Sequence, residues 1–128
     1  MAPLPFVPGR HAIEAYGGGG FRFAGMSHVG SILATPRGIS ALAAASIGEV
    51  GDEALAPLIA ELEATPGAVD LLVVGTGVSP TRLSETLIGR LRALGLRFET
   101  MATGPAAHIY NVLVEEGRRV AALLIAVA

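Results

Sequence analysis

Two continuous apolar runs constrain the fold of this chain more than any other feature of its sequence. They are DLLVVG at residues 70–75 and VAALLIAV at residues 120–127, and neither alternates polar with apolar residues. A strand with one face in water alternates with a period of two, whereas a strand buried on both faces is apolar throughout. We therefore predict that these runs are interior strands of one mixed sheet and that they lie next to each other.

Helical patterns precede and separate the two runs. A first helix carries its apolar residues on one stripe and ends at TPG, residues 65–67. This stripe consists of Leu55, Leu58, Ile59 and Leu62. A strand, LRFET at residues 96–100, is expected between the second and third helices. The alternation of helix and strand predicts a sheet with helices packed on it and right-handed crossovers.

Polar residues and prolines mark where the second and third helices start. Ser79 is the expected N-cap of the second helix, with Pro80 as its first residue. Thr103 or Gly104 is the expected cap of the third helix, with Pro105 as its first residue. Each of these helices is thus expected to begin soon after a strand ends.

The N-terminal part of the chain has a different character. Residues 11–42 contain short runs broken by glycine, which favours an antiparallel, strand-rich portion. We interpret YGGGGF at residues 16–21 as a hairpin connection rather than a phosphate-binding loop. Residues 1–10, with three prolines among the first eight, are expected to be a loosely ordered lead-in to a single domain of residues 1–128.

The composition excludes several classes of function. The nine basic residues are all Arg, and the absence of Lys removes the P-loop lysine and Schiff-base chemistry. The absence of Cys removes disulfides, thiolate metal sites and a Cys nucleophile. A net charge of −2 offers no basic surface, so we expect no nucleic acid partner. No apolar run reaches the roughly 20 residues of a membrane helix, so we expect no membrane insertion and a cytoplasmic location.

The apolar content also predicts association. Apolar residues make up 52% of the chain and charged residues only 16%, with a mean hydropathy of +0.59. Because a chain of this size cannot cover so much apolar surface, we expect a protein partner or a homo-oligomer.

Four motifs in order along the chain carry a resemblance to a known family. They are FRFAG at 21–25, SILATPRGI at 31–39, LLVVGTG at 71–77 and the C-terminal MATGPAAHIYNVLVEEGRRVAALLIAVA at 101–128. The chain resembles the small-domain family that includes mitochondrial complex I assembly factor 3 and the adipogenesis-associated Mth-type domain proteins. The resemblance implies an α/β fold of three layers, with a central mixed β-sheet flanked by helices and an additional N-terminal antiparallel β portion.

The resemblance also implies a class of function. Eukaryotic members assist the assembly of a respiratory complex, and no enzymatic activity is established for bacterial members. It therefore implies a bacterial, non-catalytic protein-interaction or assembly-factor-like domain, linked to respiratory-complex or membrane-protein assembly. The chain departs from the family pattern at His108 and Ile109, where many members have Arg and Thr, while Tyr110 and Asn111 agree with it.

Two loops are candidates for a binding site. Gly75, Thr76 and Gly77 follow one expected strand, and Thr103 and Gly104 follow another. If these strands are parallel neighbours, both loops lie at the same edge of the sheet and bring two helix N-termini to one concavity. The loops are then either a site for a small anion or acidic side chain, or simply a glycine turn and a helix cap.

Three further residues complete this hypothetical pocket. Arg37, in the turn TPRG, could close it, because a guanidinium suits a carboxylate or phosphate; the alternative is a solvated surface arginine. Tyr110 lies on the apolar stripe of the third helix and is expected to form a wall of the pocket and part of the core. Asn111 lies beside that stripe and could cap a neighbouring loop.

The sequence spacing of the His, Glu and Ser residues does not support a catalytic or metal site. His11 and Glu14 are three residues apart, which is wrong for one face of a strand, and His28 and His108 have no adjacent carboxylate. No Ser lies in a G-x-S-x-G turn. We predict no catalytic residue, metal or cofactor, although the sequence does not settle whether the chain is an enzyme. The alternative to an interaction domain is a small-molecule or anion-binding protein that uses the two loops.

Overall fold

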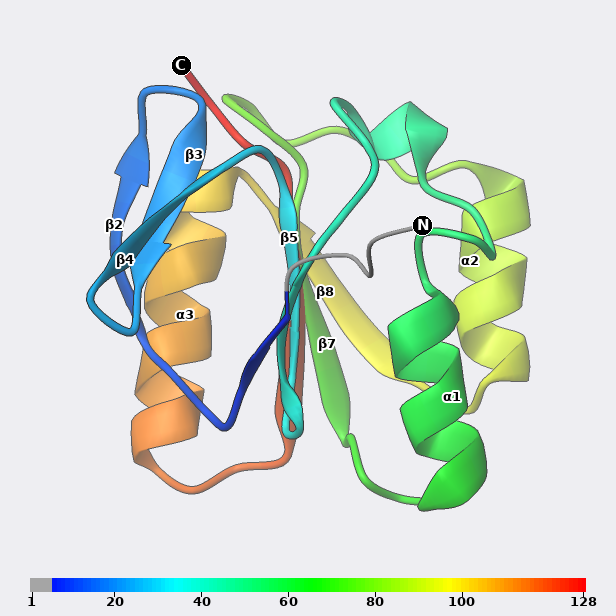
Figure 1. Ribbon diagram of the computed structural model, residues 1–128. Coiled ribbons are helices and arrows are strands. Elements are labelled where there is room, and N and C mark those ends of the chain that lie inside the picture. Colours follow the sequence, from blue (N-terminus) through cyan, green and yellow to red (C-terminus); the bar gives the residue numbers. More distant parts are fainter. Residues whose placement is uncertain (1–5) are drawn as a thin grey trace, which may run out of the picture.

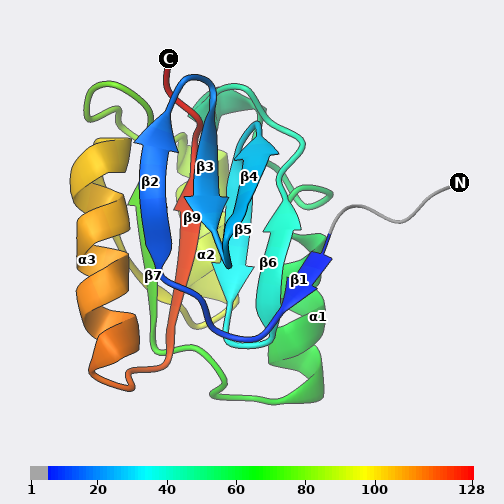
Figure 2. The ribbon, with the colours of Figure 1, turned by 60° about the vertical axis from the view of Figure 1, so that its left-hand side comes forward.

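A six-stranded mixed sheet forms the middle of three layers (Figures 1 and 2). The computed structural model describes residues 6–128. In spatial order the strands are β1 (Phe6–Pro8), β6 (Gly38–Ala41), β5 (Ile32–Thr35), β9 (Val120–Leu124), β7 (Leu71–Gly75) and β8 (Arg97–Met101). Strands β9, β7 and β8 are mutually parallel, and β5, β6 and β1 continue the sheet in antiparallel pairs.

The prediction of two neighbouring interior strands is confirmed. β7 and β9 pair in parallel, with Leu71 opposite Val120 and Gly75 opposite Leu124, and each has a strand on its other side. All five residues of β9 are buried. In β7, Leu72, Val73 and Val74 have no exposed surface. Their unbroken apolar sequence is the consequence of packing against a layer on both faces.

Helices α1 (Ala56–Ala64) and α2 (Glu85–Ala93) cover one face of the sheet (Figure 1). A short 3-10 turn, Ile47–Glu49, precedes them. Leu55 and Leu58 of the predicted stripe are fully buried against this face, and the helix ends at Ala64, before the predicted TPG stop. The first helix is therefore present where the apolar spacing predicts it.

The predicted start of the second helix is wrong. Ser79 and Pro80 lie in a loop, and α2 begins at Glu85 with Ser84 as its N-cap, whose hydroxyl accepts the Leu87 N–H at 3.1 Å. The reason is a competing hydrogen bond: the Thr76 hydroxyl donates to the Ser79 carbonyl at 2.9 Å. This contact holds the segment after β7 in a loop, so the later serine takes the capping role.

The other face of the sheet is covered by a helix and a second sheet (Figure 2). The helix is α3 (Thr103–Glu115), and the three-stranded antiparallel sheet consists of β2 (Ile13–Gly17), β3 (Gly20–Phe23) and β4 (Met26–Val29). Gly17, Gly18 and Gly19 have positive φ angles in the β2–β3 turn, so YGGGGF is the predicted hairpin connection. The N-terminal antiparallel portion is confirmed.

The predicted cap of the third helix is wrong by one or two residues. Ala102 is the N-cap and Thr103 is the first helical residue, so Pro105 is the third. The Thr103 side chain does not cap the helix, because its hydroxyl donates to the Ile125 carbonyl at 2.7 Å. Thr103 therefore ties the helix to the end of β9.

Part of the predicted loose lead-in is a strand. Phe6, Val7 and Pro8 form β1, which pairs with β6 from Phe6–Ser40 to Pro8–Gly38. Residues 1–5 lie outside the described residues. The strand was not predicted because three of the first eight residues are prolines. A proline is nevertheless compatible with a strand at the edge of a sheet.

Candidate functional site

The two predicted loops meet at the carboxyl ends of β7 and β8, as their parallel pairing requires. Gly75 lies directly against α3: a Cβ placed on it would be 2.9 Å from the Thr103 Cα and 3.1 Å from the Ala106 Cβ. Glycine is needed here so that the helix can approach the strand. The expected juxtaposition of Gly75, Thr76 and Gly77 with Thr103 is thus present.

The polar groups of these loops bond to one another. The Gly77 N–H donates to the Thr103 hydroxyl at 3.0 Å, and the Thr103 N–H donates to the Gly77 carbonyl at 2.8 Å. The Thr76 hydroxyl accepts the Thr81 N–H at 3.0 Å, and the Thr76 N–H donates to the Met101 carbonyl at 2.9 Å. The N–H groups of Thr76, Gly77 and Thr103 are therefore engaged within the protein, and Thr103 is fully buried.

Arg37 lies at the other end of the sheet from these loops, which corrects the predicted pocket. Gly75 aligns with Leu124, and Leu124 aligns with Ile32, the first residue of β5. Arg37 comes two residues after the end of β5 and therefore lies at the end of the sheet where β7 begins. The sequence could not show this, because the antiparallel direction of β5 depends on which strand it pairs with.

At that end Arg37 lines a small cavity of about 210 Å³ beside a buried carboxylate. Glu61 is only 3% exposed and accepts a hydrogen bond from the Thr35 hydroxyl at 2.5 Å. Phe6 and Pro57 form apolar walls of the same cavity. The buried glutamate anchors α1 to the β5–β6 turn.

Gly104 and Asn111 of the predicted pocket line a different groove, of about 330 Å³, between α3 and β2. Tyr16 covers Gly104 so closely that a Cβ at this position would collide with the tyrosine hydroxyl. Asn111 accepts the Ile13 N–H through Oδ1 at 2.7 Å and donates through Nδ2 to the Ile13 carbonyl at 2.8 Å. Asn111 therefore caps the edge of β2 in the way a neighbouring strand would.

Tyr110 belongs to the core between α3 and the central sheet, as its position on the helical stripe predicts. It is 1% exposed, and burial raises the pKa of its hydroxyl to about 12, with a smaller opposing effect from Arg10. A phenol with this pKa stays neutral at physiological pH. Tyr110 is a packing residue and does not wall a pocket formed by the two loops.

Titratable side chains do not converge on a metal in the described part of the chain. Within residues 6–128, no group of three or more His, Asp or Glu side chains is placed to hold an ion. The four ion pairs between described residues all involve exposed or half-exposed side chains, such as Arg90 with Asp52 at 2.8 Å and Arg119 with Asp70 at 3.0 Å. These pairs contribute little to stability and define no reaction centre.

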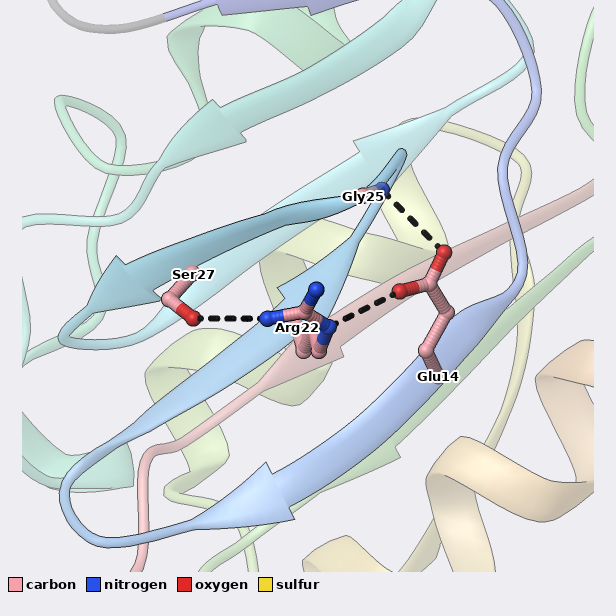
Figure 3. Close-up of polar contacts among 4 residues, drawn as sticks. All are labelled: Glu14, Arg22, Gly25 and Ser27. Atoms are coloured by element: carbon pink, nitrogen blue, oxygen red, sulfur yellow. Dashed lines mark hydrogen bonds and ion pairs between the residues drawn. The ribbon is translucent and has the colours of Figure 1, made fainter.

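The three-stranded sheet has a polar outer face (Figure 3). Arg22 of β3 contacts Glu14 of β2, with 3.4 Å between Nε and Oε1, and donates to the Ser27 hydroxyl of β4 at 3.4 Å. Glu14 also accepts the N–H of Gly25 in the β3–β4 turn at 3.2 Å. Glu14 is the extra residue of a bulge in β2, which turns its carboxylate toward that hairpin. These contacts link the three strands on the face turned away from the core.

A cavity of about 280 Å³ lies on the inner side, between β4 and the β6–β1 edge of the central sheet. Phe23 and His28 come from the small sheet, and Val7 and Ile39 come from the large one. The His28 ring is tilted by 46° against Phe23, with 6.2 Å between their centroids. Its Nε2 atom is buried and has no hydrogen-bond partner among the described residues.

Two exposed apolar residues of β4 border this cavity. Met26 is 46% exposed and lies on the inner face opposite Phe23, whereas Val29 is 88% exposed, borders the cavity at the end of β4 and has its side chain on the outer face with Ser27. β4 pairs only with β3, so its outer edge has no strand on it within residues 6–128. We call Met26, His28, Val29 and the open edge of β4 the β4 surface. His28 was weighed only as a metal ligand, and MSHV at 26–29 gives no alternating strand signal because two polar residues are adjacent in it.

The comparison with protein families decides the affiliation of the chain. Residues 13–125 match the family described as "Protein of unknown function (DUF498/DUF598)". The chain belongs to this family. The DUF498 match covers all of the elements described above except β1, so the resemblance inferred from the four motifs is confirmed.

Two proteins are similar to this DUF498 domain in sequence. It is 42% identical to an uncharacterised protein of Rhodobacter capsulatus, over 98% of this chain and 93% of that protein. It is 33% identical to NADH dehydrogenase [ubiquinone] 1 alpha subcomplex assembly factor 3 of Xenopus tropicalis, over 88% of this chain. The matched part spans 60% of that assembly factor. The predicted relationship to a complex I assembly factor is therefore confirmed at the level of the family.

Solved structures confirm the three-layer fold. A crystal structure described as an outer membrane protein of Bartonella henselae is similar with a TM-score of 0.85 and 41% identity, over 94% of this chain and 98% of that one. A Mth938-like domain of Bordetella pertussis is similar with a TM-score of 0.74 and 25% identity, over 89% and 84% of the two chains. Within residues 6–128 of this DUF498 domain, no helix is both long and apolar enough to cross a bilayer.

Proposed function

We propose that this DUF498 domain is a non-catalytic interaction domain that holds a partner protein during the assembly of a respiratory complex. The relationship to complex I assembly factor 3, at 33% identity over 113 residues, supports the biological setting. The β4 surface supports the molecular role, since it combines exposed apolar side chains with unpaired backbone groups.

The observation that carries the proposal is the cavity beneath β4. Met26 is exposed beside this cavity of about 280 Å³, and Val29 is exposed on the outer face at the end of β4, although other apolar residues of the small sheet, such as Phe21 and Phe23, are buried. A space of this size accepts one or two apolar side chains. The edge of β4 beside it offers N–H and C=O groups to an extended segment of the partner.

His28 adds a polar requirement to the partner. A buried ring nitrogen without a hydrogen bond costs about 1–3 kcal/mol relative to a satisfied one. A partner group that bonds to His28 Nε2 would recover part of this energy on binding. The surface therefore suits an extended peptide with an apolar side chain flanked by a hydrogen-bonding group.

We do not extend the proposal to anion binding at the two loops after β7 and β8. The Gly77 and Thr103 N–H groups already donate to partners within the protein. Arg37, which was expected to supply the charge, lies at the opposite end of the sheet. Neither component of an anion site is free at this position.

The proposal is tested by complementation in the organism that carries the gene. The gene is deleted, and assembled complex I is measured by native gel electrophoresis and NADH:quinone oxidoreductase activity. The deleted strain is then supplied with the wild type, with Val29→Glu or with Val78→Glu. Val78 is the matched control because it is also 88% exposed but lies in the loop after β7, away from the β4 surface.

We expect the wild type and Val78→Glu to restore complex I and Val29→Glu to fail at equal protein level. If the amount of complex I is unchanged after deletion, the proposed role in respiratory-complex assembly is wrong. If Val29→Glu restores complex I fully, the β4 surface is not the binding site for the partner.

A further inference from the structure

The central sheet ends in a strand with an open edge. β8 pairs with β7 on one side, and no strand lies on its other side within residues 6–128. β1, at the opposite end of the sheet, has three residues and contains Pro8, which has no N–H to donate. β8 has five residues and no proline. Of the two ends, β8 is the better template for another strand.

The phase of the β7–β8 ladder shows which backbone groups face outward. The Thr76 N–H donates to the Met101 carbonyl at 2.9 Å, and Met101 is the register partner of Gly75. In a parallel ladder a residue bonded in this way directs both backbone groups at the neighbouring strand, and the residues next to it direct theirs away. The N–H and C=O groups of Phe98 and Thr100 therefore face the open edge.

The side chains of β8 favour one way of pairing two copies. Arg97 and Glu99 are exposed, carry opposite charges and lie two residues apart on the same face of the strand. An antiparallel pairing with two-fold symmetry about Phe98 places Arg97 of each copy opposite Glu99 of the other. Symmetry about Arg97 or about Glu99 would instead place like charges opposite each other, which is destabilising.

We propose that two copies of this chain dimerise through β8, antiparallel and centred on Phe98, so that their central sheets form one continuous sheet. The outward N–H and C=O groups of Phe98 in the two copies then bond to each other. The Thr100 N–H of each copy meets the Leu96 carbonyl of the other. The Leu96 N–H is not used, because it already donates to the Leu91 carbonyl at 3.1 Å.

The dimer does not depend on the proposed function. β8 and the β4 surface lie at different parts of the molecule, since β4 covers the β6 end of the sheet and β8 forms the other end. The dimer would therefore leave one β4 surface free on each copy. Failure of either proposal leaves the other untouched.

Charge reversal tests the pairing in solution. Analytical ultracentrifugation should show a dimer for the wild type. Arg97→Glu and Glu99→Arg should each weaken it by about tenfold or more, because each change creates two like-charge contacts at the symmetric interface. The double variant Arg97→Glu/Glu99→Arg should restore the wild-type dissociation constant to within about threefold, because it exchanges the partners of both pairs. Arg82→Glu, which changes an exposed arginine outside β8, is the matched control and should leave the dimer unchanged.

Disulfide trapping tests the register. The chain has no cysteine, so introduced thiols report only on their own positions. Opposed residues in a non-hydrogen-bonded antiparallel pair have Cα atoms about 4.5 Å apart, within the range of a disulfide. A mixture of Arg97→Cys and Glu99→Cys chains should oxidise to a cross-linked heterodimer, whereas each variant alone should give little cross-linking.

Amide hydrogen exchange gives a readout that does not use substitutions. The Phe98 and Thr100 N–H groups should be protected at concentrations where the dimer forms and should lose protection on dilution. A wild-type chain that remains monomeric at millimolar concentration would overturn the proposal. So would a dimer whose dissociation constant is unaffected by both single charge reversals, or one that cross-links 97 to 97 rather than 97 to 99.

Discussion

The side-chain amide of Asn111 forms two hydrogen bonds with the backbone of Ile13, at 2.7 Å to its N–H and 2.8 Å to its carbonyl. One side chain of α3 thus occupies the position on β2 that a neighbouring strand would otherwise take. The contact joins residues 98 apart in sequence and fixes the small sheet to the helix beside it. The β4 surface depends on this attachment, because β2, β3 and β4 are hydrogen-bonded in one sheet.

Asn111→Ala should destabilise the protein by about 1–3 kcal/mol, since it leaves both backbone groups of Ile13 without their partner. Urea denaturation measures the change. His108→Ala is the control, because this exposed side chain lines the same groove and should change stability by less than about 0.5 kcal/mol. Equal effects from the two substitutions would show that the amide contacts contribute nothing specific.

Gly75→Ala should destabilise the protein by about 1–3 kcal/mol through overpacking. A Cβ at this position would lie 2.9 Å from the Thr103 Cα and 3.0 Å from the Leu124 side chain, both of which are held in the core. Gly89→Ala is the matched control: this glycine lies inside α2 with open space around it, so alanine should stabilise by about 0.5–1 kcal/mol. Thermal melting of the two variants should therefore show shifts of opposite sign.

The local sequence predicted those parts of the fold that depend on burial and periodicity. The runs at 70–75 and 120–127 identified β7 and β9 as interior neighbours, because only strands covered on both faces are apolar throughout. The stripe of the first helix and the glycine hairpin of β2–β3 were predicted for the same reason: each is determined by residues close in sequence.

Features that depend on long-range pairing could not be predicted. Arg37 was expected beside the loops after β7 and β8, but the antiparallel pairing of β5 with β9 carries it to the far end of the sheet. The start of α2 was misplaced for a local reason: the Thr76 hydroxyl donates to the Ser79 carbonyl three residues later, and the capping preferences of Ser and Pro do not include this competing contact. The β4 surface was missed because the neighbours of His28 come from β6 and β1, whose positions depend on the whole fold.

Thr103→Val should destabilise the protein by about 2 kcal/mol or more, because valine keeps the shape of threonine but lacks its hydroxyl. In the wild type that hydroxyl accepts the Gly77 N–H at 3.0 Å and donates to the Ile125 carbonyl at 2.7 Å. Thr103→Ser retains both hydrogen bonds and should destabilise the protein clearly less than Thr103→Val. Should serine prove as damaging as valine in urea denaturation, the methyl group rather than the hydroxyl would be the important part.

Tyr110 should make stability depend on pH in the alkaline range. Burial raises the pKa of its hydroxyl from 10.0 to about 12, with a smaller lowering effect from Arg10. As pH rises above 10, the unfolded chain therefore loses this proton before the folded chain does, which favours unfolding. The contribution is fully present below about pH 10 and is lost between about pH 10 and 12, by up to about 2–3 kcal/mol.

Urea denaturation at pH 8, 10 and 11 measures this loss in the wild type and in Tyr110→Phe, which has no proton to release and should lose less stability over the same interval. A direct titration is also available, because the chain has two tyrosines and no tryptophan. In a Tyr16→Phe variant the tyrosinate absorbance near 295 nm reports Tyr110 alone, and it should rise with a midpoint near pH 12 or with alkaline unfolding, whichever comes first. A midpoint near pH 10 in the folded protein would mean that the Tyr110 hydroxyl is solvated, and that the core between α3 and the central sheet is open to water at this position.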